Sequence, residues 1–276
     1  MAKVDLHTHT TASDGVLSPC EIIDQAISLG IDLLAITDHD TIEGYREACA
    51  YRSDAIRLIA GTELSASWGK IGIHIVALGF DPTSGVLLDW LARQSELRMN
   101  RAQAIAGSLE RSGITNALAG ASAIAGSAHP GRAHFAEYLV QAGFAPNRRR
   151  AFSRFLGDRK LSGIDTLWPS VGQTVKTINA AGGRAVLAHP GHYDLTRGAR
   201  RRLIAEFADA GGTAIELHCA SVPSAPNDEL LASARHHELA ISTGSDFHRP
   251  AQPWAQLGHV AEVVPGTPVV WAEWLN

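Results

Sequence analysis

Short apolar runs and longer amphipathic segments alternate along most of this chain. Seven apolar runs bounded by turn residues predict buried strands at 4–6, 32–37, 56–64, 72–80, 184–190, 213–219 and 239–248. Amphipathic segments predict helices at 19–30, 43–51, 84–111, 169–181 and 196–210, and around Leu230. These repeated strand–helix units predict an α/β fold with a parallel sheet or barrel.

Local signals mark the start of the first helix. Ser18 is the expected N-cap, Pro19 the first helical position, and Glu21 the partner that closes a capping box. We therefore expect the helix to begin at Pro19.

The alternation stops after Gly113 and resumes near Pro169. Residues 114–135 are rich in small side chains and show no strand–helix rhythm, while 135–143 and 148–156 predict amphipathic helices. We therefore expect a mainly helical insertion, 99–167, within a body made of 1–98 and 168–276.

The net charge also differs between the insertion and the body. The segment 99–167 holds nine of the 24 basic and four of the 28 acidic residues, which gives it a net charge of +5 and leaves −9 for the rest. An acidic body suits metal cations, and a basic insertion suits an anionic substrate beneath it. The alternative is a helical surface that is basic without function.

The composition, 45% hydrophobic and 19% charged residues, is that of an ordinary globular protein. No apolar run approaches the ~20 residues that span a bilayer, and the first ten residues lack the apolar region of a signal peptide. Cys20, Cys49 and Cys219 are far apart and indicate neither a disulfide framework nor a C-x-x-C metal site. We therefore expect a cytoplasmic protein with no membrane partner.

Imidazole and carboxylate side chains recur at the ends of the predicted strands. The candidate metal ligands are His7, His9, Asp14, His39, Glu63, His74, His189, Asp246 and His248. Because the carboxyl ends of parallel strands converge on one face, these side chains should meet there. His74 is the exception, since it opens its strand and needs an antiparallel or irregular strand to reach that face.

Each of these signals is weak alone, and together they are strong. An H-x-H pair is often structural, and Asp38 alternatively caps the helix that follows it. Gathered and buried, such groups need cations to offset their charge. Nine ligands exceed what one ion uses, so we expect two or three divalent ions. Mixed imidazole and carboxylate donors suit Mn²⁺, Zn²⁺ or Fe²⁺, whereas sites for Mg²⁺ are mostly oxygen.

Six motifs along the body resemble, in order, those of the PHP superfamily, named for polymerase and histidinol phosphatase. They are "DLHTHT..SDG", "AITDHDT", "GTELS", "HIVALGF", "LAHPG" and "GSDFH". The resemblance implies a distorted (β/α)₇ barrel with a trinuclear metal site. It is closest to bacterial stand-alone members with a helical insertion, which are nucleoside 3′,5′-bisphosphate phosphatases and 5′→3′ exoribonucleases on short RNA.

The resemblance also implies which residues hold which ion. One ion would be held by His7, His9, Glu63 and Asp246; a second by Glu63, His74 and His189; the third by Asp14, His39 and His248. Asp14 stands where many relatives have a histidine, which favours Mn²⁺, with Zn²⁺, Fe²⁺ and Mg²⁺ as the other candidates. Asp38 is expected at the catalytic centre, where it either orients a ligand or has a purely structural role.

The insertion is expected to select the substrate. Arg132 and His134 resemble the Arg-x-His-Phe segment with which the family contacts substrate phosphate, and an arginine fork fits a phosphate group. Arg148, in the basic run 148–150, is a further candidate on a rim that binds phosphate. The alternative for each of them is a solvated helix surface.

Two candidate contacts lie in the body. Ser65 is expected to bind substrate, and no histidine base accompanies it, so we do not expect a Ser-His-Asp mechanism. His192 stands where relatives often carry Arg or Lys after "HPG", and is expected to donate to phosphate or to protonate the leaving group. Residues 159–168 also depart from the family pattern, which leaves the nucleotide preference open.

The expected function is a metal-dependent phosphoesterase that removes the 3′-phosphate of nucleoside 3′,5′-bisphosphates and trims short 5′-phosphorylated RNA, using water activated by the ions. A histidinol-phosphate or general phosphomonoesterase is the nearest alternative. A metal amidohydrolase is disfavoured, because neither Lys3, Lys70 nor Lys176 ends a strand. The last alternative is a metal-binding module without catalytic activity. We expect a nucleotide or short RNA as partner, with no DNA-binding module and no obligate protein partner.

Overall fold

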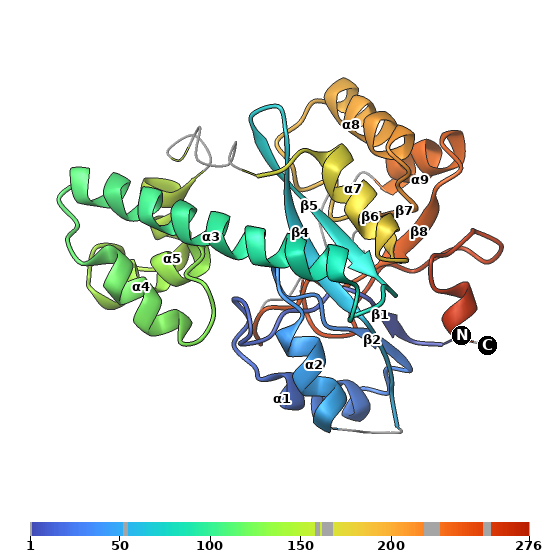
Figure 1. Ribbon diagram of the computed structural model, residues 1–276, viewed down its shortest axis with the longest axis horizontal. Coiled ribbons are helices and arrows are strands. Elements are labelled where there is room, and N and C mark those ends of the chain that lie inside the picture. Colours follow the sequence, from blue (N-terminus) through green and yellow to red (C-terminus); the bar gives the residue numbers. More distant parts are fainter. Residues whose placement is uncertain are drawn as a thin grey trace.

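The computed structural model describes residues 2–51, 55–157, 161, 168–217, 227–250 and 255–275. Its strands are β1 (Val4–Asp5), β2 (Leu33–Ala35), β3 (Arg57–Ile59), β4 (Gly61–Trp68), β5 (Ile71–Leu78), β6 (Arg184–Leu187), β7 (Ala214–Leu217) and β8 (Ala240–Thr243). Its helices are α1 (Pro19–Ser28), α2 (Glu43–Tyr51), α3 (Gly85–Arg111), α4 (Ala117–Ala125), α5 (Arg132–Gln141), α6 (Arg148–Ala151), η1 (Phe152–Leu156), α7 (Val171–Ala180), α8 (Arg197–Asp209), α9 (Asn227–His236) and η3 (Ala272–Leu275). Their order follows the predicted alternation (Figure 1).

The strands form a distorted barrel. A parallel sheet of β1, β2 and β3 continues into a second sheet of β4 to β8, and only Ala60 separates β3 from β4. On the other side, the Leu6 N–H donates to the Thr243 carbonyl at 3.1 Å, and Thr8 bridges to Phe247. With β3 and β4 counted as one bent run, seven runs close on themselves, in agreement with the expected barrel.

Strand β5 is the irregular member of this barrel. It pairs antiparallel with both β4 and β6, while β6, β7 and β8 are parallel to one another. A two-residue turn, Gly69–Lys70, makes the reversal, and Gly69 adopts the left-handed φ of 60° that glycine tolerates. The reversal carries the beginning of β5, with His74, to the face where the parallel strands end.

Helices cover the outside of the barrel and bury its apolar side chains. The predicted capping box of α1 is present: the Ser18 side chain accepts from the Glu21 N–H, and Glu21 accepts from the Ser18 N–H. The largest apolar core lies between β4 to β8 and helices α3, α7, α8 and α9. A smaller core packs α1 and α2 against β2.

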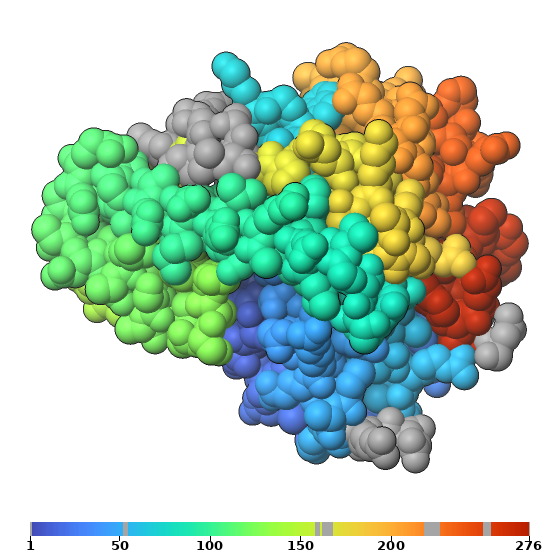
Figure 2. Space-filling model, in the orientation of Figure 1, coloured from blue at the N-terminus to red at the C-terminus, as the bar shows by residue number. Residues whose placement is uncertain are grey.

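Helix α3 leaves the body and carries the insertion (Figure 1). Leu87 and Leu91 near its start belong to the body core, whereas Ile105 and Leu109 near its end belong to a separate apolar cluster with α4, α5 and η1. In the space-filling view the insertion forms a lobe on one side of the molecule (Figure 2). The predicted boundary between residues 98 and 99 lies inside α3, and residues 162–167 at the other boundary lie outside the described residues.

Helix α4 has no signal in the hydrophobic pattern. Six of its nine residues are alanine or glycine, so it lacks the polar–apolar period on which helix prediction depends. Its place is set by close packing: a Cβ at Gly120 would lie 2.0 Å from the Tyr138 ring of α5. A residue without a side chain therefore lets α4 and α5 approach each other.

Among the described residues, no helix is both long enough and apolar enough to cross a bilayer. Cys20 and Cys49 are free thiols, and Cys219 lies outside the described residues.

Candidate metal centre

All nine candidate ligands converge at the end of the barrel. His7 and His9 follow β1, His39 follows β2, His189 follows β6, and Asp246 and His248 follow β8, while Glu63 and His74 extend from β4 and β5. Asp14 joins them from the turn after His9. The ends of the parallel strands thus bring most of these side chains together, and the antiparallel β5 adds His74.

Glu63 lies at the middle of this cluster and is inaccessible to solvent. Its two carboxylate oxygens lie 2.8–3.4 Å from imidazole nitrogens of His7, His9, His39, His74 and His189. One carboxylate that contacts five imidazoles from four different segments is suited to bridge neighbouring cations.

The donor atoms fall into four overlapping groups, within each of which they lie no more than 4.8 Å apart. The groups are His7, His9 and Asp246; His9, Asp14, His39 and His248; His7, Glu63 and His189; and His39, Glu63 and His74. Because the groups share members, the ions that they would hold are close neighbours. The assignment of each ligand to a particular ion stays a prediction.

The donor atoms themselves indicate that the cluster is built for cations. Five of them are buried without a hydrogen bond of acceptable geometry within the described part of the chain: His7 Nε2, His9 Nε2, Asp14 Oδ1, His39 Nδ1 and Glu63 Oε2. Buried polar atoms are nearly always paired, so a group of unpaired nitrogen and oxygen donors facing one another fits divalent ions.

Two ligands also hold strained backbone conformations. His189 has a φ of 32° and Asp246 a φ of 51°, in the left-handed region that side chains other than glycine seldom adopt. Such strain costs about 1–3 kcal/mol and collects at functional sites, where the surrounding structure enforces it.

Neighbouring charges keep the carboxylates ionised, and the pKa values of the imidazoles shift in opposite directions. Burial alone would raise the pKa of Glu63, but His74, His39 and His7 hold it well below its usual range. Burial, together with His248, lowers the pKa of His9 to about 3. For His248 itself, burial alone would lower the pKa, but Asp14 and Asp246 raise it to about 10. Since a metal takes imidazole in its neutral form, cation binding displaces protons from this cluster.

Glu216 is a site residue that sequence reasoning missed. It is the next-to-last residue of β7 and is buried, with Oε1 3.0 Å from His7 Nδ1 and Oε2 accepting from the His189 N–H at 2.7 Å. Anchoring Nδ1 of His7 leaves its Nε2 to face the cluster, which is how an outer carboxylate fixes a ligating histidine. A charged residue at the end of the apolar run "TAIEL" was the available signal.

Replacing Glu216 by glutamine should lower Mn²⁺ affinity by about 10–100-fold. Glutamine has one side-chain acceptor where Glu216 uses two, so either His7 or the His189 N–H loses its partner. Titration calorimetry with Mn²⁺ measures the effect. Glu206→Gln is the matched control, because a single oxygen suffices to accept from the Trp68 indole. Equal affinities for both variants would contradict the positioning role.

Asp38 lies beneath the cluster and belongs to none of the four groups. Its buried carboxylate accepts from the Thr10 N–H at 2.8 Å, the Thr10 hydroxyl at 2.6 Å and the Ser13 hydroxyl at 2.6 Å. These bonds hold the turn that ends in Asp14. The geometry therefore favours the positioning role over direct contact with substrate.

A cavity of about 500 Å³ opens beside the candidate ligands, and we name it the basic cavity. Asp14, His39, His74 and His189 line it together with Lys70, Arg98, Arg101, Arg132 and His192. Ser65, Phe152, Trp168 and Tyr193 complete much of the lining. Three of the predicted substrate contacts, Ser65, Arg132 and His192, are thus brought next to the metal centre.

Arg98 and Arg101 are basic residues of this cavity that the sequence pattern did not single out. They lie three positions apart on α3, so they share a face of the helix. The Arg98 Nε donates to the buried Asp40 carboxylate at 2.6 Å, and its Nη2 donates to the Ser65 hydroxyl at 3.1 Å. Asp40 and Ser65 therefore fix the arginine fork at the edge of the metal centre.

His192 packs on a candidate ligand. Its ring stacks on that of His189, with centroids 5.6 Å apart and planes at 19°. Burial, with His189, lowers the pKa of His192, which keeps the ring neutral near pH 7. A neutral imidazole carries one N–H, which is the group that would donate to a phosphate oxygen.

The other two predicted contacts, His134 and Arg148, differ in their surroundings. His134 is buried at the start of α5, where its Nδ1 accepts from the Gly131 N–H at 2.9 Å, so part of its function is to cap the helix. Arg148 donates to Glu137 at 3.2 Å and to the Ala133 carbonyl at 3.3 Å, and it does not line the basic cavity. Their contact with substrate stays a prediction.

Comparison with known proteins agrees with this geometry. A family model described as the PHP domain matches residues 5–118. The chain is 41% identical to the 5′-3′ exoribonuclease Rnm of Escherichia coli, over 98% of this chain and 93% of the relative. It is 38% identical to the 3′,5′-nucleoside bisphosphate phosphatase of Chromobacterium violaceum, over 99% of this chain and 96% of the relative.

Solved structures show the same similarity. A Chromobacterium violaceum structure described as an amidohydrolase, with bound sulfate and no metal, superposes with a TM-score of 0.88 at 38% identity, over 99% of this chain and 95% of that one. A Bifidobacterium adolescentis structure, described as a candidate metal-dependent phosphoesterase, gives 0.78 at 26% identity, over 97% and 92%. With these relatives, and with the ligand cluster at the end of its barrel, the chain belongs to the PHP family.

Proposed function

We propose that this protein is a metal-dependent phosphoesterase that removes the 3′-phosphate of nucleoside 3′,5′-bisphosphates and trims short 5′-phosphorylated RNA from its 5′ end. The observation that carries the proposal is the basic cavity, whose lining combines candidate metal ligands with Lys70, Arg98, Arg101 and Arg132. Metal ligands beside a cluster of cationic side chains suit a substrate with more than one phosphate. The activities named for the similar proteins of E. coli and C. violaceum support the same substrates.

The nine candidate ligands would hold two or three divalent ions, and their mixed nitrogen and oxygen donors fit Mn²⁺ best, with Zn²⁺, Fe²⁺ and Mg²⁺ as alternatives. When bound, the ions supply positive charge at the phosphoryl oxygens and lower the pKa of water from ~15.7 towards 7.

The side chains of the cavity would position the substrate. Arg98 and Arg101, with Arg132 at the start of α5, would bind the phosphate that is not attacked, because guanidinium forks pair with phosphate oxygens. His192 would donate its N–H to the reacting phosphate or to the leaving oxygen. The lobe 99–167 would act as a cap that brings Arg101 and Arg132 over the metal centre.

One bond change accounts for both reactions. A water oxygen bonds to phosphorus, the bond from phosphorus to the 3′-oxygen breaks, and that oxygen takes a proton. In a bisphosphate the phosphorus leaves as inorganic phosphate. In RNA it remains on the second nucleotide as its new 5′-phosphate. The 5′-phosphate of the first nucleotide is held in either case.

The Mn²⁺-loaded protein should release phosphate from adenosine 3′,5′-bisphosphate, measured by a phosphate assay. Adenosine 3′-monophosphate should react about 10–100-fold more slowly, because it lacks the 5′-phosphate that the arginines bind through charge-assisted hydrogen bonds. Adenosine 5′-monophosphate is the control without a scissile 3′-phosphate. Preference for histidinol phosphate or for an amide substrate would contradict the assignment.

A further inference from the structure

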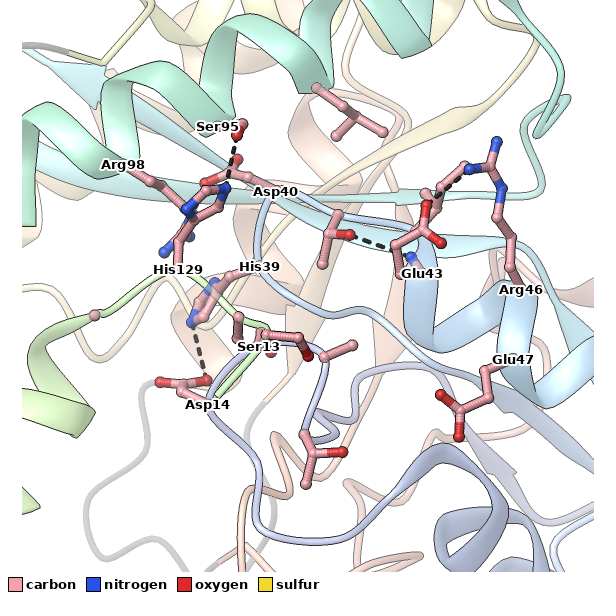
Figure 3. A pocket seen from close by; sticks show the side chains of 18 of the residues that line it. Ser13, Asp14, His39, Asp40, Glu43, Arg46, Glu47, Ser95, Arg98 and His129 are labelled. Atoms are coloured by element: carbon pink, nitrogen blue, oxygen red, sulfur yellow. Dashed lines mark hydrogen bonds and ion pairs between the residues drawn. The ribbon is translucent and has the colours of Figure 1, made fainter. Parts of the chain in front are cut away.

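A second cavity, of about 450 Å³, lies on another side of the metal centre, and we name it the side cavity (Figure 3). It is lined by the loop 11–14, the start of α2, the middle of α3, the segment 127–131 before α5 and His134 in the first turn of α5. Four residues line both cavities: Asp14, His39, Arg98 and Gly131. The two cavities therefore adjoin at candidate metal ligands, and the proposed function uses only one of them.

Part of the side-cavity lining combines an apolar surface with uncharged hydrogen-bonding groups. Ile42, Leu88 and Leu91 supply the apolar part. The Ser95 hydroxyl and His129 Nε2 form a hydrogen bond of 2.6 Å from α3 to the segment before α5 (Figure 3). Apolar surface with a few fixed polar groups is the usual lining of a small-molecule site, and the volume falls within the ~300–1,000 Å³ range of such sites.

The charges in the side cavity do not favour a phosphate group. Arg46 is paired with Glu43 at 2.7 Å, and Glu47 adds a further negative charge. Arg98 is turned toward the buried carboxylate of Asp40. Burial, with Arg98, lowers the pKa of His129, so that ring contributes no positive charge near pH 7. The cavity therefore suits an uncharged ring system, in contrast to the basic cavity.

We propose that the side cavity binds the second nucleoside of an RNA substrate, the one joined through its 5′-oxygen to the phosphorus under attack. This inference rests on the proposed function. With the first nucleotide's 5′-phosphate in the basic cavity and the scissile phosphate at the ligands that line both cavities, the chain continues into the side cavity. Its base packs on Leu88 and Leu91, and its ribose hydroxyls meet Ser95 and His129.

The side cavity therefore distinguishes two substrates of one site. A nucleoside 3′,5′-bisphosphate ends at the attacked phosphate, so nothing of it enters the side cavity. RNA has a nucleoside there. A change confined to this cavity should impair RNA hydrolysis and spare the bisphosphate.

A tryptophan substitution at Ser127 tests this separation. Ser127 is exposed at the cavity lining, so Ser127→Trp fills the cavity without disturbing the core. Ala123→Trp is the matched control, since Ala123 is also exposed nearby on α4 and does not line the cavity. For Ser127→Trp, kcat/KM on a 5′-phosphorylated RNA trinucleotide should fall at least about tenfold, chiefly through KM, while adenosine 3′,5′-bisphosphate stays within about twofold. The control should leave both unchanged.

Binding gives a second readout. A 5′-phosphorylated dinucleotide with a methylene in place of the bridging 3′-oxygen cannot be cleaved there. It should bind the Mn²⁺-loaded protein more tightly than an adenosine 5′-phosphate that carries a methylenephosphonate at its 3′ carbon and so ends at the attacked phosphorus, and Ser127→Trp or His129→Ala should remove that gain.

The outcomes that contradict the two proposals are distinct. Unchanged RNA hydrolysis in Ser127→Trp, equal loss on both substrates, or no gain in affinity from the second nucleoside would overturn the side-cavity inference. Failure of the unaltered protein to hydrolyse the bisphosphate would overturn the proposed function instead.

Discussion

Glu63→Gln should remove essentially all phosphoesterase activity, lowering kcat about a thousandfold or more, which corresponds to roughly 4 kcal/mol of barrier. Glu63 contacts imidazoles of five histidines through its two oxygens. Glutamine keeps the shape but loses the negative charge, and it replaces one acceptor oxygen by an NH₂ group that points at donors or cations. The centre would then hold fewer ions, and those that remain would lack the shared ligand.

Metal content by plasma emission spectroscopy and kcat on adenosine 3′,5′-bisphosphate measure the two parts of this effect. Glu206→Gln is again the control, because it makes the same chemical change on the body away from the cluster and should retain both. A Glu63→Gln protein with unchanged metal content and rate would show that the Glu63 carboxylate is needed neither to hold the ions nor for catalysis.

Sequence alone identified the cluster because its members obey a local rule. Most of them follow an apolar run that is recognisable as a strand, and parallel strands end on one face whatever their exact lengths. Position at the end of a strand was enough to predict that His7, His39 and His189 belong to the cluster. His74 broke the rule, and that exception itself predicted the antiparallel strand that the structure contains.

The partners that support the cluster could not be paired from the sequence, although Glu216 stands out as a charged residue in the apolar run "TAIEL". Glu216 anchors His7 across 209 positions, and Arg98 meets Asp40 across 58. Neither pair leaves a periodic or spacing signal in the chain. A lone charged residue in a strand or on a helix resembles an ordinary surface residue until the fold shows what faces it.

Candidates chosen by residue type rather than by strand position differ in whether they lie at the basic cavity. Arg132 lines the basic cavity, whereas Arg148, sixteen positions later, is engaged by Glu137. Asp38 accepts from Thr10 and Ser13 of the neighbouring loop, and His134 caps the start of its own helix. Side-chain direction in an insertion depends on packing between short helices, which carries no simple pattern, so motif resemblance locates such residues only coarsely.

Arg98→Met should both destabilise the protein and weaken phosphate binding. The Asp40 side chain is wholly inaccessible, and Arg98 Nε lies 2.6 Å from its Oδ2. Methionine keeps much of the apolar stem but leaves a buried carboxylate without its countercharge, a change that costs about 3–5 kcal/mol. The melting temperature should fall by about 10 °C. Arg93→Met is the matched control, being an exposed arginine on the same helix that should melt like the unaltered protein.

A compensating change separates the two effects. Asp40→Asn removes the buried charge, keeps an acceptor for the Ser65 N–H and suits the left-handed φ of 52° found at this position. Combined with Arg98→Met, it should therefore regain most of the lost stability. Activity on the bisphosphate should not return, because no guanidinium then lies beside Ser65 at the metal centre.

Two results would contradict this dual role of Arg98. If the double variant recovered its rate together with its melting temperature, Arg98 would matter only for folding. If the single variant melted normally, the buried pair would contribute nothing to stability. The expected split, with stability restored and catalysis still lost, follows from Arg98 lying between a buried carboxylate on one side and the basic cavity on the other.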